Sequence, residues 1–185
     1  MKIGSIVQVR SFAEYVVRVP VDENSGYIPA SSLGIGSYVS IKSAQGSVIG
    51  VISDILHNVK EDLLPYLPQE KQEVFVPYMA DFRSSYVVIT GIGCMSTGLP
   101  SHTIAFTPAI NDIVELMHPA DIKAFHHTGD GKMSFGYYKK LTQSTSPAVA
   151  SSAIDRASEA MPECSGMLKA LKKFTENRYE AGRRR

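Results

Sequence analysis

The residues whose types could support chemistry are scattered along the chain. The stretch 128–132, T-G-D-G-K, shares the Gly-Lys ending of a phosphate-binding loop. Such a loop needs Gly-x-x-x-x-Gly-Lys-Ser/Thr, so that backbone N–H groups hold phosphate oxygens and a hydroxyl binds Mg²⁺. His126 occupies the position of the first glycine, and Met133 occupies that of the hydroxyl residue. We therefore interpret the stretch as a connecting turn and predict no cofactor site.

Histidines are the next candidates, as metal ligands. His126 and His127 could act together with His118 or His102. Adjacent side chains point to opposite faces of a strand, or about 100° apart on a helix, so neighbouring histidines rarely bind one ion. The sequence also contains no His-x-x-x-His or Cys/His spacing typical of zinc sites. We predict no metal site and expect His126 and His127 to lie at the surface or in a turn.

Nucleophilic catalysis would need a Ser or Cys with an adjacent base and a group that orients the base. Cys94 follows Gly-Ile-Gly, but no Gly-x-Ser-x-Gly nucleophile motif is present, and the pair Glu61 and Asp62 lies in a polar, proline-rich stretch. Cys94 and Cys164 belong to no Cys-x-x-Cys motif, and we expect both to be free thiols in a reducing cytoplasm. The sequence thus predicts no catalytic residue, and an enzyme would need a site that no linear motif displays.

Basic residues gather at the C-terminus, where residues 165–185 contain seven Lys or Arg and two Glu, a net charge of +5. The whole chain has a net charge of +1, which leaves −4 for the rest. Such a segment could neutralise nucleic-acid phosphates or contact another acidic partner. A solvated helix face is the alternative. The candidate contact residues are Lys169, Lys172, Lys173, Arg178, Arg183, Arg184 and Arg185.

The stretch 34–56 is the clearest structural element, because it predicts two strands joined by a tight turn. Residues 38–42 alternate polar and apolar side chains, which is the period of a half-buried strand. Gly46 ends the short loop, and residues 47–55 form the second strand. Gly50 interrupts that strand, which predicts a bulge or a bend.

Further short strands are predicted at 3–10, 13–21, 85–93 and 112–116, and a last one at 132–141. Frequent turn signals between short strands are typical of a small barrel or sandwich. The residues by themselves predict a mainly β fold with α additions, as a small barrel or a sandwich. A barrel domain would span residues 1–141, with a helical, proline-rich insertion near 57–82.

Residues 146–182 predict a C-terminal helical segment, followed by a basic tail at 183–185. Ser146 and Pro147 suit the N-cap and first position of a helix, and Pro162 should end or kink it. A second helix carries Met167, Leu168, Leu171 and Phe174 at helical spacing, with Gly182 expected just past its end. We expect this apolar face to pack on the barrel, with a partner chain as the second option.

The barrel pattern resembles a known family, the HAS-barrel, which is the N-terminal β-barrel of HerA-type DNA-translocating ATPases and rotary ATP synthases. The resemblance rests on short motifs within residues 1–141: Ile3-Gly4-Ser5-Ile6-Val7, Gly36-x-Tyr38-Val39-x-Ile41, the run G-S-V-I-G-V-I from Gly46, the segment from Phe106-Thr107-Pro108 to Val114, and Phe135-Gly136-Tyr137. The resemblance implies the fold class, a small closed antiparallel β-barrel of six strands. It also implies a seat on a hexameric ring and, in HerA-type proteins, contact with the nuclease NurA. Where those proteins begin a P-loop ATPase domain, this sequence has its helical segment, so no ATP hydrolysis is predicted.

The leading functional hypothesis is a non-enzymatic assembly or adaptor protein, a stand-alone HAS-like barrel that binds a protein partner or self-associates. The alternative is a nucleic-acid-binding accessory protein that uses the basic C-terminal helix. A third is an enzyme whose site is assembled from distant residues. No apolar run is long enough to cross a bilayer and no signal peptide is visible, so we expect a cytoplasmic location without membrane partners.

Overall fold

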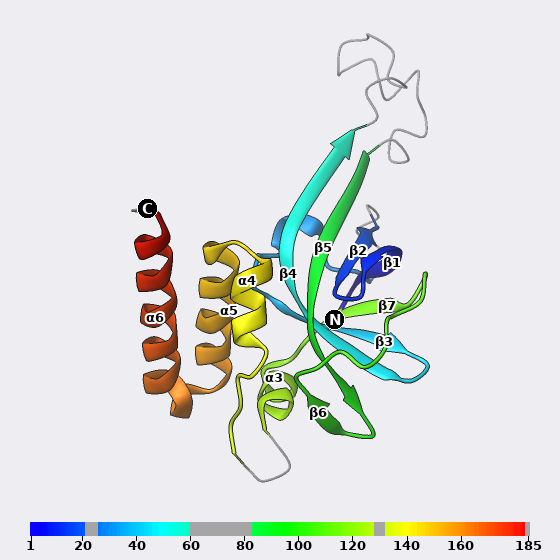
Figure 1. The fold of residues 1–185 in the computed structure, drawn as a ribbon. Coiled ribbons are helices and arrows are strands. Elements are labelled where there is room, and N and C mark those ends of the chain that lie inside the picture. The colour runs from blue at the N-terminus through cyan, green and yellow to red at the C-terminus, as the bar shows by residue number, and fades with distance from the viewer. Residues whose placement is uncertain (21–25, 60–82, 128–131, 184–185) are drawn as a thin grey trace, which may run out of the picture.

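The computed structural model describes residues 1–20, 26–59, 83–127 and 132–183 (Figure 1). Within these ranges, the side chains of 58–59, 83–84, 178 and 180–183 are not described. The helical insertion predicted near 57–82 therefore lies outside the described residues from residue 60 onward, while residues 57–59 still belong to a strand.

Six antiparallel strands close into a barrel, as the sequence predicted. Their order around it is β2-β1-β7-β3-β4-β5, and the pairing of β5 with β2 completes the closure. A seventh strand, β6, lies outside the ring and pairs with the end of β5. The bounds are Lys2–Ser11 (β1), Glu14–Val19 (β2), Tyr38–Ser43 (β3), Gly46–Val59 (β4), Arg83–Ser96 (β5), Leu99–Ser101 (β6) and Ile113–Leu116 (β7).

The β3–β4 hairpin forms where the alternating pattern predicted it. Its ladder runs in continuous register from Tyr38 opposite Val51 to Ser43 opposite Gly46. The bulge expected at Gly50 is confirmed, because the β4–β5 register shifts between Ile49 and Gly50. The extra residue lies on the partner strand β5, and a Cβ at position 50 would clash with the Ile89 side chain. The missing side chain therefore lets β5 pass close to β4.

The interior of the barrel is a packed core, in which branched aliphatic side chains meet from all six strands. Most of them are fully buried, so the barrel holds no open channel along these strands. The cluster consists of Ile3, Ile6, Tyr15, Val17, Val19, Ile28, Leu33, Val39, Ile41, Val48, Ile52, Val87, Ile89 and Val114.

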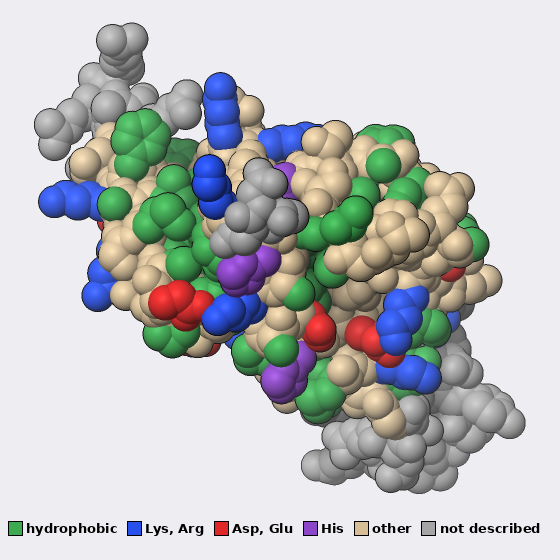
Figure 2. Space-filling view, turned by 90° about the horizontal axis from the view of Figure 1, so that it is seen from below, with side chains coloured by type: hydrophobic (Ala, Val, Ile, Leu, Met, Phe, Trp, Pro, Cys, Tyr) green, Lys and Arg blue, Asp and Glu red, His purple; other side chains and the backbone are tan. Residues whose placement is uncertain are grey.

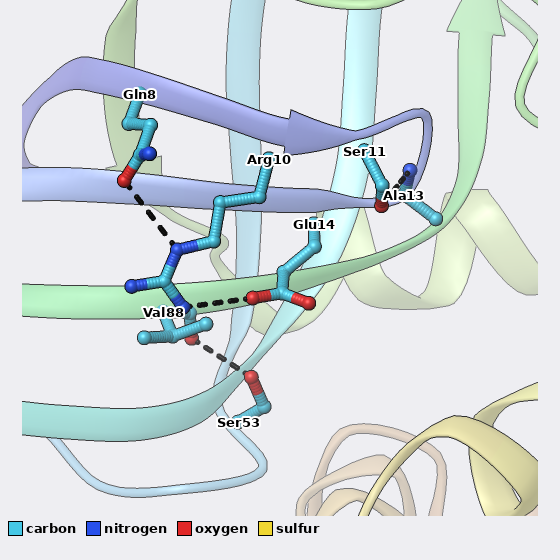
Figure 3. A network of polar contacts seen from close by, with 7 residues as sticks. All are labelled: Gln8, Arg10, Ser11, Ala13, Glu14, Ser53 and Val88. Carbon is cyan, nitrogen blue, oxygen red and sulfur yellow. Dashed lines mark hydrogen bonds and ion pairs between the residues drawn. The ribbon is translucent and has the colours of Figure 1, made fainter.

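The β1–β2 hairpin carries an exposed polar network on its outer face (Figure 3). Arg10 lies between Gln8 and Glu14, with its Nη1 atom 2.9 Å from Glu14 Oε1 and its Nε atom 3.4 Å from Gln8 Oε1. More than two fifths of both the Arg10 and the Glu14 side chain is exposed, so water screens this ion pair. Such exposed pairs stabilise a fold by at most about 1 kcal/mol. The network therefore adds little to the stability of the barrel.

Four α-helices of the described chain gather on one side of the barrel (Figure 1). They are α3 (Pro119–His126), α4 (Tyr138–Ser144), α5 (Pro147–Ala160) and α6 (Ser165–Arg183), with short 3-10 turns at Ala30–Ser32 and Pro162–Cys164. The predicted start of α5 is confirmed: Ser146 is its N-cap, and the Ser146 side chain accepts a hydrogen bond from the Val149 N–H at 3.5 Å. Pro162 follows its end, as expected.

A second core joins this helical layer to the barrel. Along α5, the buried residues Val149, Ala150, Ala153, Ile154 and Ala157 pack with Tyr38, Ile49 and Val51 of the barrel. Gly36 permits the close approach: its φ is +77°, and a Cβ there would lie 2.6 Å from Ala153 N. Small residues on α5 and the absent side chain at position 36 therefore set the distance between helix and barrel.

Three predictions about the second half of the chain are wrong. Residues 132–141 do not form a strand; Met133 makes only an isolated bridge with His127, and α4 begins at Tyr138. Gly182 lies within α6 rather than past its end. The α6 helix packs mainly on α5 instead of directly on the barrel strands, and Leu168 is its fully buried anchor.

Candidate functional site

The stretch that resembled a phosphate-binding loop does not have the required context in the described residues. Residues 128–131 lie outside them, and Lys132 is exposed in an irregular segment. A helix precedes the stretch and the next helix starts only at Tyr138, whereas a phosphate-binding loop joins a strand to an immediately following helix.

His126 corrects the sequence prediction, because it is fully buried rather than at the surface or in a turn. It is the last residue of α3, and its ring packs edge-on against Tyr38 and beside Phe135. His127 is half-buried at the C-cap, and His118 is exposed, where its ring accepts from Ala120 N–H at the helix start. Among the described residues, no group of three or more His, Cys, Asp or Glu is arranged to hold a metal ion.

His126 belongs to a buried hydrogen-bond chain that links the helical layer to the barrel. Its Nδ1 atom lies 2.7 Å from the Ile122 carbonyl oxygen and must therefore carry the proton. In the neutral ring, Nε2 accepts from the Tyr137 hydroxyl at 2.8 Å. The Tyr137 oxygen then accepts from the Tyr38 hydroxyl at 2.7 Å, and the Ala153 carbonyl lies 3.2 Å from Tyr38 as a second acceptor.

Burial controls the proton affinities in this chain. Loss of hydration lowers the pKa of His126 to about 4, although the hydrogen bond to Ile122 opposes this shift. Burial also raises the pKa values of Tyr38 and Tyr137 above their ordinary value. All three side chains are therefore neutral near pH 7, which is the state that the chain of donors and acceptors requires.

His102 holds the same segment from its other side. Its Nδ1 atom accepts from the Gly136 N–H at 3.1 Å, so Nε2 carries the proton and donates to the Phe125 carbonyl at 3.3 Å. Burial lowers the pKa of His102. The two histidines thus use opposite tautomers to fix residues 134–137 just before α4 begins. This role is structural.

The two cysteines are free thiols in the structure. Cys94 is buried in β5 and donates to the Thr103 carbonyl, with 3.3 Å between sulfur and oxygen. The thiol proton of Cys94 is therefore donated to a backbone carbonyl, and this contact supplies no base that could activate the thiol.

The basic residues predicted on α6 are only partly described. Lys169 and Lys173 are exposed and lie one turn apart. Lys172 is committed to an ion pair with α5, since its Nζ atom lies 2.8 Å from each carboxylate oxygen of Asp155. The side chains of Arg178 and Arg183, and the residues Arg184 and Arg185, lie outside the description.

The structure brings other residues together in a cavity between α4 and α6. Its volume is about 670 Å³, and it is partly open to solvent. Tyr179 belongs to its wall, and the Tyr179 hydroxyl donates to the Thr142 carbonyl and so ties α6 to α4. The lining residues are Phe135, Gly136, Tyr138, Lys139, Thr142, Gln143, Leu171, Phe174, Thr175 and Tyr179.

The cavity walls are mainly apolar and aromatic, although Phe174 is 65% exposed. Tyr138 is buried, and its hydroxyl has no hydrogen-bond partner among the described residues. The Thr175 hydroxyl donates to the Leu171 carbonyl at 2.9 Å and lies close to Tyr138, but the hydroxyls of Thr175 and Tyr138 do not meet the geometry of a hydrogen bond. Burial raises the pKa of Tyr138, although the nearby Thr175 hydroxyl opposes this shift, so the Tyr138 hydroxyl stays protonated. The mainly apolar space is thus bounded by α4, α6 and the segment that leads into α4.

The comparisons with known proteins place the chain in a family. The family described as "Domain of unknown function (DUF8166)" matches residues 1–172. The chain belongs to this family. The DUF8166 match covers the barrel, α3 to α5 and the first part of α6, so barrel and helical layer occur together within one family unit. No curated protein matches the chain.

None of the residues that line this cavity is predicted from the sequence as a site residue. A local signal existed for α4: Tyr137, Tyr138 and Leu141 have helical spacing, but Phe135 and Tyr137 also fit an alternating strand. The position of α6 against α4 depends on contacts between segments more than thirty residues apart, such as Tyr179 with Thr142. No linear pattern contains that information.

Proposed function

We propose that this protein is a non-enzymatic assembly or adaptor module of the HAS-barrel type, which binds a protein partner or further copies of itself. The observation that carries the proposal is the closed six-stranded barrel with a filled interior. A filled barrel has no lumen for a substrate, so binding must use the outer surface. We further propose that the protein partner is a ring-shaped ATPase of the HerA type, because the HAS-barrel type implies that class of partner.

The outer surface of the helical layer supports this proposal. Met167 and Phe174 on α6 are 48% and 65% exposed, although they are large and apolar. The net charge of +1 produces little repulsion between copies of the chain. In the space-filling view, the helical side on the left carries apolar side chains bordered by basic and acidic ones (Figure 2).

The test of self-association is the mass of the native protein, measured by light scattering after size exclusion. We expect a multiple of the 20.2 kDa chain mass, and a hexamer is the multiple that the HAS-barrel type implies. Met167→Ser should shift the protein toward the monomer. Leu99→Ser is the matched control, because Leu99 is 64% exposed on β6 at a distance from α6 in sequence and fold. A wild-type protein that stays monomeric at all concentrations would rule out self-association.

The adaptor role needs a second measurement. A monomeric protein should co-elute with a separate HerA-type ATPase ring, and absence of both self-association and co-elution contradicts the proposal. Hydrolysis of ATP or of DNA by the purified chain would overturn its non-enzymatic part.

A nucleic-acid-binding accessory role is the second candidate, and the exposed pair Lys169 and Lys173 favours it. Binding to single- and double-stranded DNA should then weaken steeply as salt is raised. The double variant Lys169→Gln/Lys173→Gln should reduce affinity, while Lys42→Gln, which removes a lysine paired with Glu115 on the barrel, should not. No binding at low salt would remove this candidate.

A further inference from the structure

The cavity between α4 and α6 has the dimensions and lining of a small-molecule site. Its volume of about 670 Å³ lies within the range of about 300 to 1,000 Å³ that ligand pockets occupy. Phe135, Leu171 and Phe174 provide apolar walls. Phe174 keeps 65% of its surface in water, and a ligand seated against it would remove part of that area from solvent.

The charge at the cavity selects the chemical class of the ligand. Among the described lining residues, Lys139 is the only charged one. The carboxylates of Glu176 and Asp155 also act electrostatically on Tyr138 in the wall, but neither lines the cavity. Asp155 is paired with Lys172. Lys139 is exposed and forms no ion pair with any residue in the described part of the chain. A cationic rim beside apolar walls complements a molecule with an anionic head and an apolar body.

We propose that this cavity binds a single-chain amphiphilic carboxylate. Its alkyl chain lies between α4 and α6 against Phe135, Leu171 and Phe174, and its carboxylate pairs with Lys139. The Tyr138 ring is part of the wall. The Tyr138 hydroxyl is closed off from the water-accessible space, so it makes no contact with the ligand head.

This site shares Phe174 with the exposed surface of α6 that supports the proposed assembly, but the two proposals are tested by separate measurements. Assembly is measured as the native mass and as its change in Met167→Ser, and Met167 does not line the cavity. Ligand binding is read per chain, whatever the number of chains in the assembly. Met167→Ser should therefore leave ligand affinity unchanged, and either proposal can fail alone.

The experiment is isothermal titration calorimetry of the full chain with sodium dodecanoate, decanoate and octanoate, each kept below its micelle concentration. We expect saturable binding of one dodecanoate per chain. Affinity should fall about fourfold for each methylene removed, because each buried CH₂ contributes a fixed apolar transfer free energy. Dodecyltrimethylammonium has the same chain with a cationic head and should bind more weakly than dodecanoate.

Two pairs of variants locate the ligand. Lys139→Gln should weaken dodecanoate binding about fivefold, the scale of a solvent-exposed ion pair. Lys140→Gln is the matched control: Lys140 is the next residue on α4, is also exposed and does not line the cavity. Phe174→Ser should weaken binding, whereas Phe12→Ser, at a 54% exposed phenylalanine of the β1–β2 turn, should not.

The proposal is overturned if wild-type protein shows no saturable dodecanoate binding, or if the Lys139 and Lys140 variants lose affinity equally. Equal binding of the cationic amphiphile would also overturn it, because the head group would then play no part. All the substituted side chains are exposed, so the variants should fold, and circular dichroism with a thermal melt verifies this.

Discussion

His126 Nε2 lies 2.8 Å from the Tyr137 hydroxyl oxygen, and neither group has access to water. This contact joins the end of α3 to the segment that leads into α4, and Tyr38 continues it to the barrel. The chain of three side chains works only with a neutral imidazole, because Nδ1 donates to Ile122 and Nε2 must accept. Stability should therefore depend on pH.

We predict that the protein loses stability as the pH falls from 6.5 to about 4. In that interval the unfolded chain protonates this imidazole, whose ordinary pKa is 6.5, whereas the folded chain keeps it neutral down to about pH 4. The free energy of unfolding should fall by about 3 kcal/mol from this residue and then level off. The lowered pKa of His102 adds a change in the same direction.

Urea unfolding measured across this pH range checks the prediction. His126→Gln removes the titrating group and should flatten the profile, whereas His127→Gln, at the half-buried C-cap, should retain it. A wild-type profile that is flat between pH 6.5 and 4 would show that burial of His126 is not linked to folding.

Tyr137→Phe should destabilise the protein by about 2 kcal/mol. It removes the donor to His126 and the acceptor of Tyr38, which leaves a buried ring nitrogen unsatisfied. Tyr38 keeps the Ala153 carbonyl at 3.2 Å, so the loss is smaller than for two orphaned groups. Denaturant unfolding at pH 7 measures the change, and Tyr86→Phe on β5, which is only half-buried, is the control.

Gly36→Ala should lower the stability of the protein more than the same substitution at a glycine that has a similar φ but lies in open space. Both Gly36 and Gly98 have positive φ, +77° and +79°, but a Cβ at Gly98 meets nothing within 4 Å. Gly98→Ala should therefore cost about 1 kcal/mol from the backbone conformation alone. Gly36→Ala should cost a further 1 to 3 kcal/mol or so, because α5 must move away from the barrel. Equal melting temperatures for the two variants would contradict the tight contact with Ala153.

Tyr138→Phe should leave stability unchanged or raise it by about 1 kcal/mol. The variant removes a buried hydroxyl that lies near Thr175 without forming a hydrogen bond of good geometry, while the ring still packs in the helical core. Thermal melts at pH 7 test this, with Tyr137→Phe as the opposite case on the neighbouring residue. A destabilisation as large as that of Tyr137→Phe would mean that the Tyr138 hydroxyl does form a hydrogen bond in solution.

Local patterns allowed part of this structure to be predicted. The β3–β4 hairpin follows from alternating side chains and Gly46, and the start of α5 follows from Ser146 and Pro147. These signals succeed because hydrogen bonds within a hairpin or a helix end connect residues close in sequence. The segment 132–141 was misassigned because Phe135, Tyr137 and Leu141 suit either period until the surrounding core is known.

The amino-acid sequence by itself determined the six strands of the barrel and the two C-terminal helices, since short-range periodicity fixes which face of each element is apolar. The tertiary structure alone decided that β2 and β5 pair to close the barrel, that His126 is buried against Tyr137, and that α6 lies beside α4 to form the cavity. Each of these contacts joins segments distant in the chain or side chains of ambiguous polarity. Their free energy depends on burial by the whole fold, which no local pattern encodes.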